Sequence, residues 1–383
     1  MSFILDRVPG ITQAPGALDQ LGALAARLGG GAPVLLVADP GLAAFGITAR
    51  AEASLRAAGL AVSLFEDIKS DPYTSQVDLA AAMALRDSAG VVVALGGGSA
   101  MDAGKAAAAV APGNAPSDHY ALCANPLPPR PLPKICVPTT SGTGSETTRT
   151  SVLTNAAGAK VWLWGEEIKA DAVLLDPMLT VGLPAHLTAA TGIDALVHAI
   201  EACTNANGNP ATDMFCHEAI RLVMRHLRTA VGEPANIEAR AAVQWAAALA
   251  GIGIDTSGTA IAHNIGHALA SLRPIHHGRA VGVAMLATLK WNAAHDPHGR
   301  FAAVAVAMGE DADPAQVPAA YERLLRDVGV RVSLRDEGSD GLSAETLAAQ
   351  MRNPENAAML VSNHRTVDDD DMLLFARTVL EQV

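Results

Sequence analysis

The sequence predicts an α/β N-terminal domain with a parallel β-sheet, followed by an all-helical C-terminal domain. In the first half, short aliphatic and β-branched runs alternate with Ala- and Leu-rich stretches, which is typical of strands and helices that alternate in a parallel sheet. After Asp176 and Pro177 no convincing strand remains, and helical patterns run from about Leu187 to the end. The 383 residues exceed one ordinary domain. We therefore expect two domains, at residues 1–183 and 184–383.

Four strands stand out in the first half. Each is followed by polar or Gly-rich residues, which is where an open α/β sheet places its ligand. A shorter candidate, Phe3–Leu5, would belong to a sheet edge or a dimer contact, and the Pro-rich stretch at 125–133 is expected to be a non-helical surface connection. The four expected strands are Val34–Ala38, Val91–Leu95, Ile135–Val137 and Ala172–Leu175.

Composition and charge narrow the class of protein. Half of the residues are hydrophobic and only 3% are aromatic, which suits helices and buried parallel strands. The net charge of −12 argues against a nucleic-acid-binding surface, so small molecules are the expected partners. The four cysteines form no CxxC pair and are expected to be reduced. Neither a secretory signal nor a membrane span is evident, and we expect a cytoplasmic enzyme.

A Gly-rich turn follows the expected strand at 91–95. Gly96, Gly97 and Gly98 precede Ser99 and a run of strong helix formers. Glycines let the backbone approach a pyrophosphate, and the helix N-terminus behind them offers free N–H groups. The turn is therefore a candidate phosphate site, with a ligand-free Gly-rich turn as the alternative. There is no GxGxxG, and Lys105 lies out of register for a P-loop, so an NTPase is not expected.

Two more polar positions lie where expected strands end. Residues 138–146 (PTTSGTGSE) follow Val137 and offer hydroxyl groups and flexible backbone. Asp39 follows Ala38 directly, at a position where a carboxylate can accept a hydrogen bond from a ribose hydroxyl and repel a 2′-phosphate. The alternative for Asp39 is a helix cap or turn former.

The second half carries a pattern of potential metal ligands. Asp194 and His198 are four residues apart in a helical run, so both project from one helix face. His263 and His267 repeat this spacing, and His277 follows ten residues later. One carboxylate with several imidazoles suits Fe(II) or Zn(II). The alternative is that these histidines lie on helix surfaces or are satisfied within the core.

Taken together, these motifs resemble the iron-containing (group III) alcohol dehydrogenases, which include lactaldehyde reductases and butanol dehydrogenases. The resemblance covers nearly the whole chain. It rests on four ordered blocks, namely the GGGS turn with Asp102, the PTTSGTGSE turn, the ATGIDALVHAIE segment at 190–201, and His263 and His267 with His277-Gly278.

The resemblance implies an architecture, cofactors and site residues. The fold would be a dinucleotide-binding domain with a helical metal-binding domain, as in the dehydroquinate synthase-like and iron alcohol dehydrogenase architecture, and we expect a homodimer. Fe²⁺, with Zn²⁺ as the alternative, would be held by Asp194, His198, His263 and His277. NAD is expected rather than NADP. Its expected contacts are Asp39, Gly97, Gly98, Ser99, Asp102, Thr139, Thr140, Thr143, Lys160 and Leu179.

The reaction that the resemblance implies is hydride transfer between an alcohol carbon and the nicotinamide, with the metal stabilising the alkoxide of the substrate. His267 would relay the proton that leaves during oxidation. Three alternatives stay open, namely a maleylacetate-reductase-like enzyme that lacks the full metal set, an NAD- and metal-dependent lyase of the same fold, and a non-catalytic nucleotide-binding protein.

The expected substrate carries an anionic group, as a hydroxy acid does. Arg149 follows the Thr-rich turn, and Arg273 lies between His263 and His277 in the sequence. An arginine can bind a carboxylate through two parallel hydrogen bonds and so position the reacting carbon. The alternative is that each arginine reaches solvent or pairs with an acidic side chain.

Overall fold

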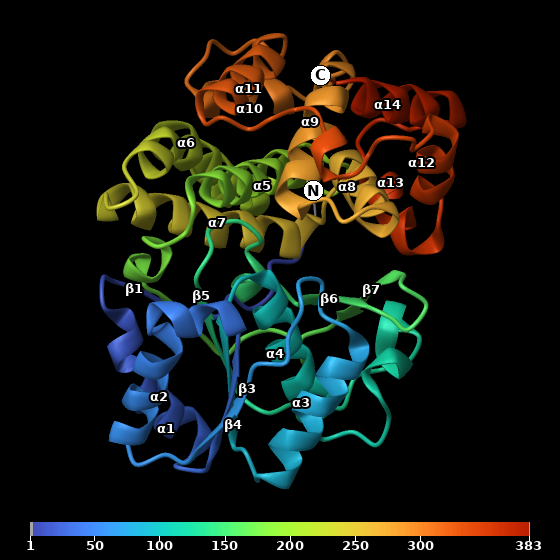
Figure 1. Ribbon diagram of the computed structural model, residues 1–383. Helices are drawn as coiled ribbons and strands as arrows, with labels where there is room; N and C mark the ends of the chain where they lie inside the picture. The colour runs from blue at the N-terminus through green and yellow to red at the C-terminus, as the bar shows by residue number, and fades with distance from the viewer. Residues whose placement is uncertain (1–2, 383) are drawn as a thin grey trace. The chain divides into compact units, whose positions relative to one another are not determined.

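The computed structural model describes residues 3–382, and these fall into two compact units (Figure 1). Arg7–Thr140 and Gly144–Leu183 form the first, which we call the sheet unit. The remaining described residues, which include Ser141–Thr143 and the chain from Pro184 onward, form the second, which we call the helical unit.

The sheet unit is built on six parallel strands in the order β1-β8-β5-β4-β2-β3. Strands β2, β4, β5 and β8 are buried along their whole length, as expected for the inner strands of a parallel sheet. Strands β6 (Thr150–Thr154) and β7 (Lys160–Trp164) form a separate antiparallel pair. The six-stranded sheet comprises β1 (Gly10–Gln13), β2 (Val34–Ala38), β3 (Val62–Phe65), β4 (Val91–Gly96), β5 (Lys134–Pro138) and β8 (Ala172–Leu175).

The four expected strands are confirmed with end shifts of one residue at most. The strand candidate at Phe3–Leu5 is wrong, because those residues form no strand; they are exposed, and a dimer contact there stays a prediction. The edge of the sheet is instead β1, in which Gly10 pairs with Ala172 of β8. Strands β1, β3, β6 and β7 were not predicted. The Pro-rich stretch at 125–133 forms neither helix nor strand, as expected.

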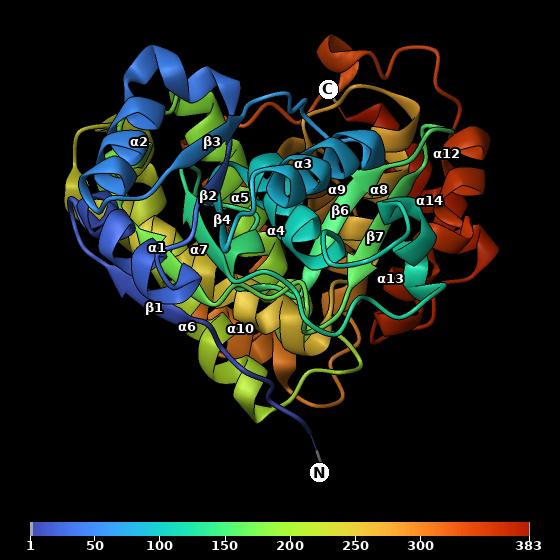
Figure 2. The same cartoon turned by 90° about the horizontal axis from the view of Figure 1, so that it is seen from below.

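Helices cover both faces of the sheet. Because successive side chains of a strand point to opposite faces, Leu35 and Val37 of β2 belong to one core and Val34 and Leu36 to another. Helices α3 and α4 pack on the first face, and α1 and α2 on the second (Figures 1 and 2). Their bounds are α1 (Leu21–Gly29), α2 (Ile47–Ala57), α3 (Thr74–Arg86) and α4 (Gly98–Val110).

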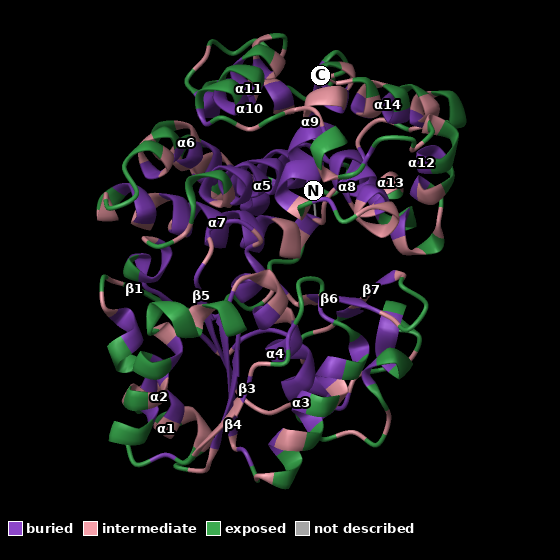
Figure 3. Ribbon diagram, viewed as in Figure 1, coloured by how far each residue is buried: buried purple, intermediate pink, exposed green. Residues whose placement is uncertain are grey.

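The helical unit surrounds α5 (Ala185–Thr204), in which every residue from Thr188 to Thr204 is buried (Figure 3). A helix that is buried on all sides must be enclosed by others, and α6, α7 and α9 pack against it. Among the described residues no strand follows β8, as predicted, and no helix is long and apolar enough to cross a membrane. The other helices are α6 (Pro210–Gly232), α7 (Ile237–Ser257), α8 (Ile261–Leu272), α9 (His277–Ala293), α10 (Arg300–Met308), α11 (Gln316–Asp327), α12 (Ala344–Met351), α13 (Ala357–Ser362) and α14 (Asp369–Glu381).

Candidate active site

Three of the polar turns predicted to contact a nucleotide meet at one edge of the sheet unit. Strands β2, β4 and β5 are neighbours, and each ends at this edge. The backbone N–H of Asp39 donates to the carbonyl oxygen of Leu95 at 3.0 Å, and that of Thr139 donates to Gly96 at 2.9 Å. The structure therefore brings together the Asp39, GGGS and Thr-rich segments, at the carboxyl edge where parallel sheets bind ligands.

In the GGGS turn, close contacts require glycine at Gly96, whereas Gly97 has room for a side-chain atom. Gly96 has a φ of 148°, and a Cβ atom there would lie 2.7 Å from the Cβ of Ala100 and 2.9 Å from that of Asp39. A Cβ on Gly97 would lie 3.4 Å from Cγ2 of Thr140. Helix α4 begins at Gly98, so its first N–H groups are free to donate to an anion.

Several predicted nucleotide contacts already have partners inside the sheet unit. The Asp39 carboxylate accepts from the backbone N–H of Gly41 at 2.8 Å, which is the turn-forming role left open above. Ser99 Oγ accepts from the backbone of Asp71, and Asp71 also pairs with Lys160 at 2.6 Å. Leu179 lies in the apolar core beneath β2 and β4. Asp71, which has a left-handed φ of 58°, was not predicted from the sequence.

Asp102 and Lys105 together hold the segment that follows the Thr-rich turn. One Asp102 oxygen accepts from Ser145 Oγ at 2.5 Å, and the other accepts from the backbone N–H of Val152 at 3.0 Å. Burial raises the pKa of Asp102, although Lys105 lies 3.5 Å away and opposes this shift. Lys105 is fully buried, and its Nζ donates to the carbonyl oxygens of Ser145 and Thr150 at 2.7 and 2.6 Å. Lys105 was not assigned to the site from the sequence, although a lysine in an Ala-rich helix was the available signal.

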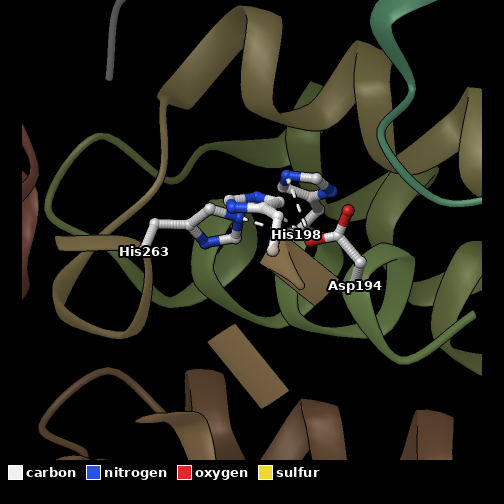
Figure 4. Close-up of side chains that lie close together, drawn as sticks. Asp194, His198 and His263 are labelled. Carbon is white, nitrogen blue, oxygen red and sulfur yellow. Dashed lines mark ion pairs between the residues drawn. The ribbon is translucent and has the colours of Figure 1, made fainter. Parts of the chain in front are cut away.

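In the helical unit, four side chains converge from three helices. Asp194 and His198 project from consecutive turns of α5, His263 comes from α8, and His277 is the first residue of α9. Asp194 Oδ1 lies 3.7 Å from Nε2 of both His263 and His277, and 3.9 Å from Nε2 of His198. Figure 4 shows Asp194, His198 and His263 pointing toward one another.

The donor atoms of this group fit a metal ion better than they fit one another. All four lie within 4.8 Å of each other, yet the distances to Asp194 Oδ1 exceed hydrogen-bonding range. Asp194 Oδ1 and His263 Nε2 are buried and have no hydrogen-bond partner. Unsatisfied buried polar atoms are costly, and a shared cation would satisfy them. Oxygen and imidazole nitrogen are ligands that suit Fe²⁺ and Zn²⁺.

Burial and charge shift the pKa values in this group. Burial lowers the pKa of His198 to about 3, so this imidazole is neutral and can coordinate a metal. Burial also lowers the pKa of His263, but the nearby Glu201 and Asp194 carboxylates outweigh it and raise the pKa to about 9. Burial opposes ionisation of Asp194, but electrostatic attraction to the surrounding His198, His277 and His263 imidazoles outweighs it and holds the pKa of Asp194 below the usual range.

Close helix packing brings His277 to the group. A Cβ atom on Gly278 would lie 2.5 Å from the carbonyl oxygen of Ala190 and 3.3 Å from Cβ of Asp194. Glycine at this position therefore lets the first turn of α9 approach α5. His267 lies one turn after His263 on α8, with its ring centroid 5.4 Å from that of His277, and it is partly exposed. It is not among the four converging donors.

The helical unit contains one predicted nucleotide contact and one carboxylate that was not predicted. Thr143 and its neighbour Gly142 belong to the helical unit, where a Cβ on Gly142 would lie 2.7 Å from Cβ of Thr191. Glu201, which was not predicted, bonds Nδ1 of His263 at 2.6 Å. Its signal in the sequence was a spacing of seven residues from Asp194, which places both carboxylates on one helix face.

The two arginines expected to bind substrate have other partners. Arg149 lies 3.3 Å from Glu166 and stacks over the Trp164 ring at 4.7 Å. Arg273 Nε donates to the carbonyl oxygen of Gly338, and its Nη1 donates to that of Leu272, both at 2.8 Å. A role of either arginine in substrate binding stays a prediction.

Comparison with known proteins identifies the family. Residues 9–177 match the model of the iron-containing alcohol dehydrogenases, and residues 188–379 match the model of the C-terminal part of the Fe-containing alcohol dehydrogenase family. The chain belongs to the iron-containing alcohol dehydrogenase family. It is therefore an oxidoreductase of the alcohol dehydrogenase and aldehyde reductase class, as the resemblance in sequence implied.

Individual members of the family are similar over most of the chain. The 1,3-propanediol dehydrogenase of Klebsiella pneumoniae is 36% identical over 82% of this chain and 83% of its own. The sulfoacetaldehyde reductase of Bilophila wadsworthia is 33% identical over 98% of both chains. Among solved structures, a 1,3-propanediol oxidoreductase matches with a TM-score of 0.91 at 32% identity, covering 99% of this chain and 100% of its own. The sulfoacetaldehyde reductase of Bifidobacterium kashiwanohense in complex with NAD⁺ matches with a TM-score of 0.90 at 29% identity, covering all of both chains.

Replacing Lys105 with Met tests whether this lysine holds the Thr-rich segment. We expect the free energy of unfolding to fall by about 3–5 kcal/mol, because Asp102 would keep a buried charge without its cation and several carbonyl oxygens would lose their donor. Urea unfolding followed by tryptophan fluorescence measures the loss. The control is Lys290→Met at an exposed position on α9, which should change stability by less than about 0.5 kcal/mol. Equal effects in the two variants would contradict the assigned role.

Proposed function

We propose that this chain interconverts an alcohol with its aldehyde or ketone, using NAD and one divalent metal ion, Fe²⁺ or alternatively Zn²⁺. The observation that carries the proposal is the convergence of the Asp194, His198, His263 and His277 donors, two of which are buried without hydrogen-bond partners. The family membership supports iron, and the NAD⁺ complex of a similar sulfoacetaldehyde reductase supports NAD.

The four proposed ligands differ in charge. The Asp194 carboxylate supplies negative charge, and the three imidazoles present their Nε2 atoms. When bound, the ion supplies Lewis-acid stabilisation of negative charge on the substrate oxygen, and NAD supplies the hydride acceptor. His267 is proposed to pass the substrate proton toward solvent, because it is partly exposed and neighbours His277.

The proposed nucleotide site uses the residues at the carboxyl edge of the sheet. The free N–H groups of Gly98 and Ser99 at the start of α4 would bind the pyrophosphate, with Gly97 allowing close approach. Asp39 would accept from the ribose hydroxyls. The other proposed contacts are Asp102, Thr139, Thr140, Thr143, Lys160 and Leu179.

We assign nucleotide binding to residues 1–183 and metal binding to residues 184–383. We also propose a cytoplasmic homodimer. Light scattering on the purified protein would test the oligomeric state, and a monomer at all concentrations would contradict it.

The proposed substrate carries an anionic group. The similarity to sulfoacetaldehyde reductases over almost the whole chain supports this class, because those relatives are named for a sulfonate substrate. Arg149 and Arg273 are the proposed anion-binding side chains.

For the metal site, we expect His277→Ala to lose metal and activity together, because three ligands hold an ion far more weakly than four. Even the loss of a group that only supports a ligand typically costs about 10- to 100-fold in affinity. The matched control is His267→Ala, which should keep its metal but lose turnover and show an altered pH profile. Elemental analysis and alcohol oxidation assays on anaerobically purified proteins measure both. Full metal occupancy with normal turnover in His277→Ala would remove His277 from the ligand set, and an unchanged His267→Ala would remove the proton relay.

For the cofactor, we expect Asp39→Asn to narrow the preference for NAD over NADP by about fivefold, because repulsion between two exposed charges contributes about 1 kcal/mol. The amide oxygen of Asn can still accept from Gly41, so the turn is kept while the charge is removed. The ratio of kcat/KM for the two cofactors measures the change. An unchanged ratio would mean that Asp39 does not contact the ribose.

For the substrate, we expect Arg149→Ala and Arg273→Ala to lower kcat/KM for a hydroxy acid more than for a neutral alcohol of equal length. A charge-assisted bidentate contact is lost only for the acid. Rates for both substrates in wild type and the two variants measure the difference. If neither variant discriminates between the substrates, the proposal of an anionic substrate fails.

A further inference from the structure

Glu201 is a buried carboxylate with three hydrogen-bond donors. Its Oε2 bonds Nδ1 of His263 at 2.6 Å and accepts from the backbone N–H of Ala260 at 2.9 Å. Its Oε1 accepts from the backbone N–H of Ala262 at 2.6 Å. Only 3% of Glu201 is exposed. The residue therefore fixes both the ring of His263 and the backbone from which that ring projects.

These contacts determine which nitrogen of His263 faces the other three ligands. In the neutral imidazole that binds a metal, a carboxylate at Nδ1 keeps the proton on that atom, so Nε2 is left with its lone pair. Nε2 is the atom that lies 3.7 Å from Asp194 and has no hydrogen-bond partner. We propose that Glu201 is a positioning residue that sets the tautomer and orientation of His263 and thereby the metal affinity of the site. This inference rests on the metal site of the proposed function.

Charge gives an independent argument for the same role. Asp194 and Glu201 lie on one face of α5, and both are almost completely buried. Among the described residues, their ion pairs are all with histidines, and no lysine or arginine neutralises them. A divalent cation bound to neutral imidazoles would balance two carboxylates. Glu201 thus supplies the second negative charge without occupying a coordination position.

An amide could not take over this position. Glu201 uses both oxygens as acceptors, and Gln has only one acceptor oxygen for the same three donors. With the amide oxygen toward His263, the NH₂ group would face the N–H of Ala262. With the amide reversed, the NH₂ group would face Nδ1 of His263 and favour the wrong tautomer.

The experiment compares Co²⁺ binding by wild type, Glu201→Gln and Tyr321→Phe, using metal-free proteins, competition with a chelator, and the visible absorption of bound Co²⁺. Tyr321 is the matched control because its buried hydroxyl donates to the carbonyl oxygen of Gly282 on α9 and bonds none of the proposed ligands. We expect Glu201→Gln to bind Co²⁺ about 10- to 100-fold more weakly with an altered spectrum, and Tyr321→Phe to bind as wild type. Affinity for NAD⁺ should be equal in all three.

The outcomes separate this inference from the proposed function. Wild-type affinity and spectrum in Glu201→Gln would overturn the role of Glu201, and so would an equal loss in Tyr321→Phe, which would indicate general loosening of the helices. If Glu201→Gln does not fold, Glu201→Asp provides the test, because the shorter side chain keeps the negative charge but no longer reaches His263. Wild-type Co²⁺ affinity in Glu201→Asp would overturn the role of Glu201. Failure of the wild-type protein to bind Co²⁺, Fe²⁺ or Zn²⁺ would overturn the metal site itself.

Discussion

The burial of two carboxylates on one face of α5 is the constraint on which the helical unit depends. Removing an ion from water costs several kcal/mol unless partners compensate, and Asp194 and Glu201 are both nearly inaccessible. The surrounding helices supply that compensation. At the start of α8, the backbone N–H groups of Ala260 and Ala262 donate to Glu201. At the start of α9, Nε2 of His277 lies 3.7 Å from the Asp194 carboxylate. The same contacts that stabilise the buried charge therefore bring together the four proposed metal ligands.

In the sheet unit, the ends of the parallel strands determine where the polar turns lie. Its carboxyl edge gathers turns because neighbouring parallel strands end together, and this needs no buried charge. Buried charge appears one layer behind, where Lys105 and Asp102 bind the segment from Ser145 to Val152. The polar turns at the carboxyl edge are thus supported by polar side chains that already have hydrogen-bond partners. Asp102 belongs to this supporting layer, because both of its oxygens accept hydrogen bonds from within the sheet unit.

Parts of this arrangement follow from the sequence and others do not. Inner strands such as β2 and β4 are predictable because burial on both faces leaves continuous apolar runs, whereas the partly exposed β3 shows no such run. The pairing of Asp194 with His198 follows from helix spacing. His277 was assigned to the metal ligands from the family resemblance, because the number of residues between two helices does not determine where their side chains lie in space. Glu201 was missed because its role depends on contacts with α8, which are tertiary.

For Arg149 and Arg273, position in the sequence did not predict which groups the side chains contact. Each was selected for lying near site residues along the chain, yet a long side chain finds its partners in three dimensions. Arg149 already pairs with Glu166, so a substrate anion would have to compete with a carboxylate. Arg273 bonds only neutral carbonyl oxygens among the described residues, and it keeps its positive charge available. Because an anion gains more from an uncompensated cation than from one already paired, electrostatics favours Arg273 over Arg149 as the proposed anion-binding side chain.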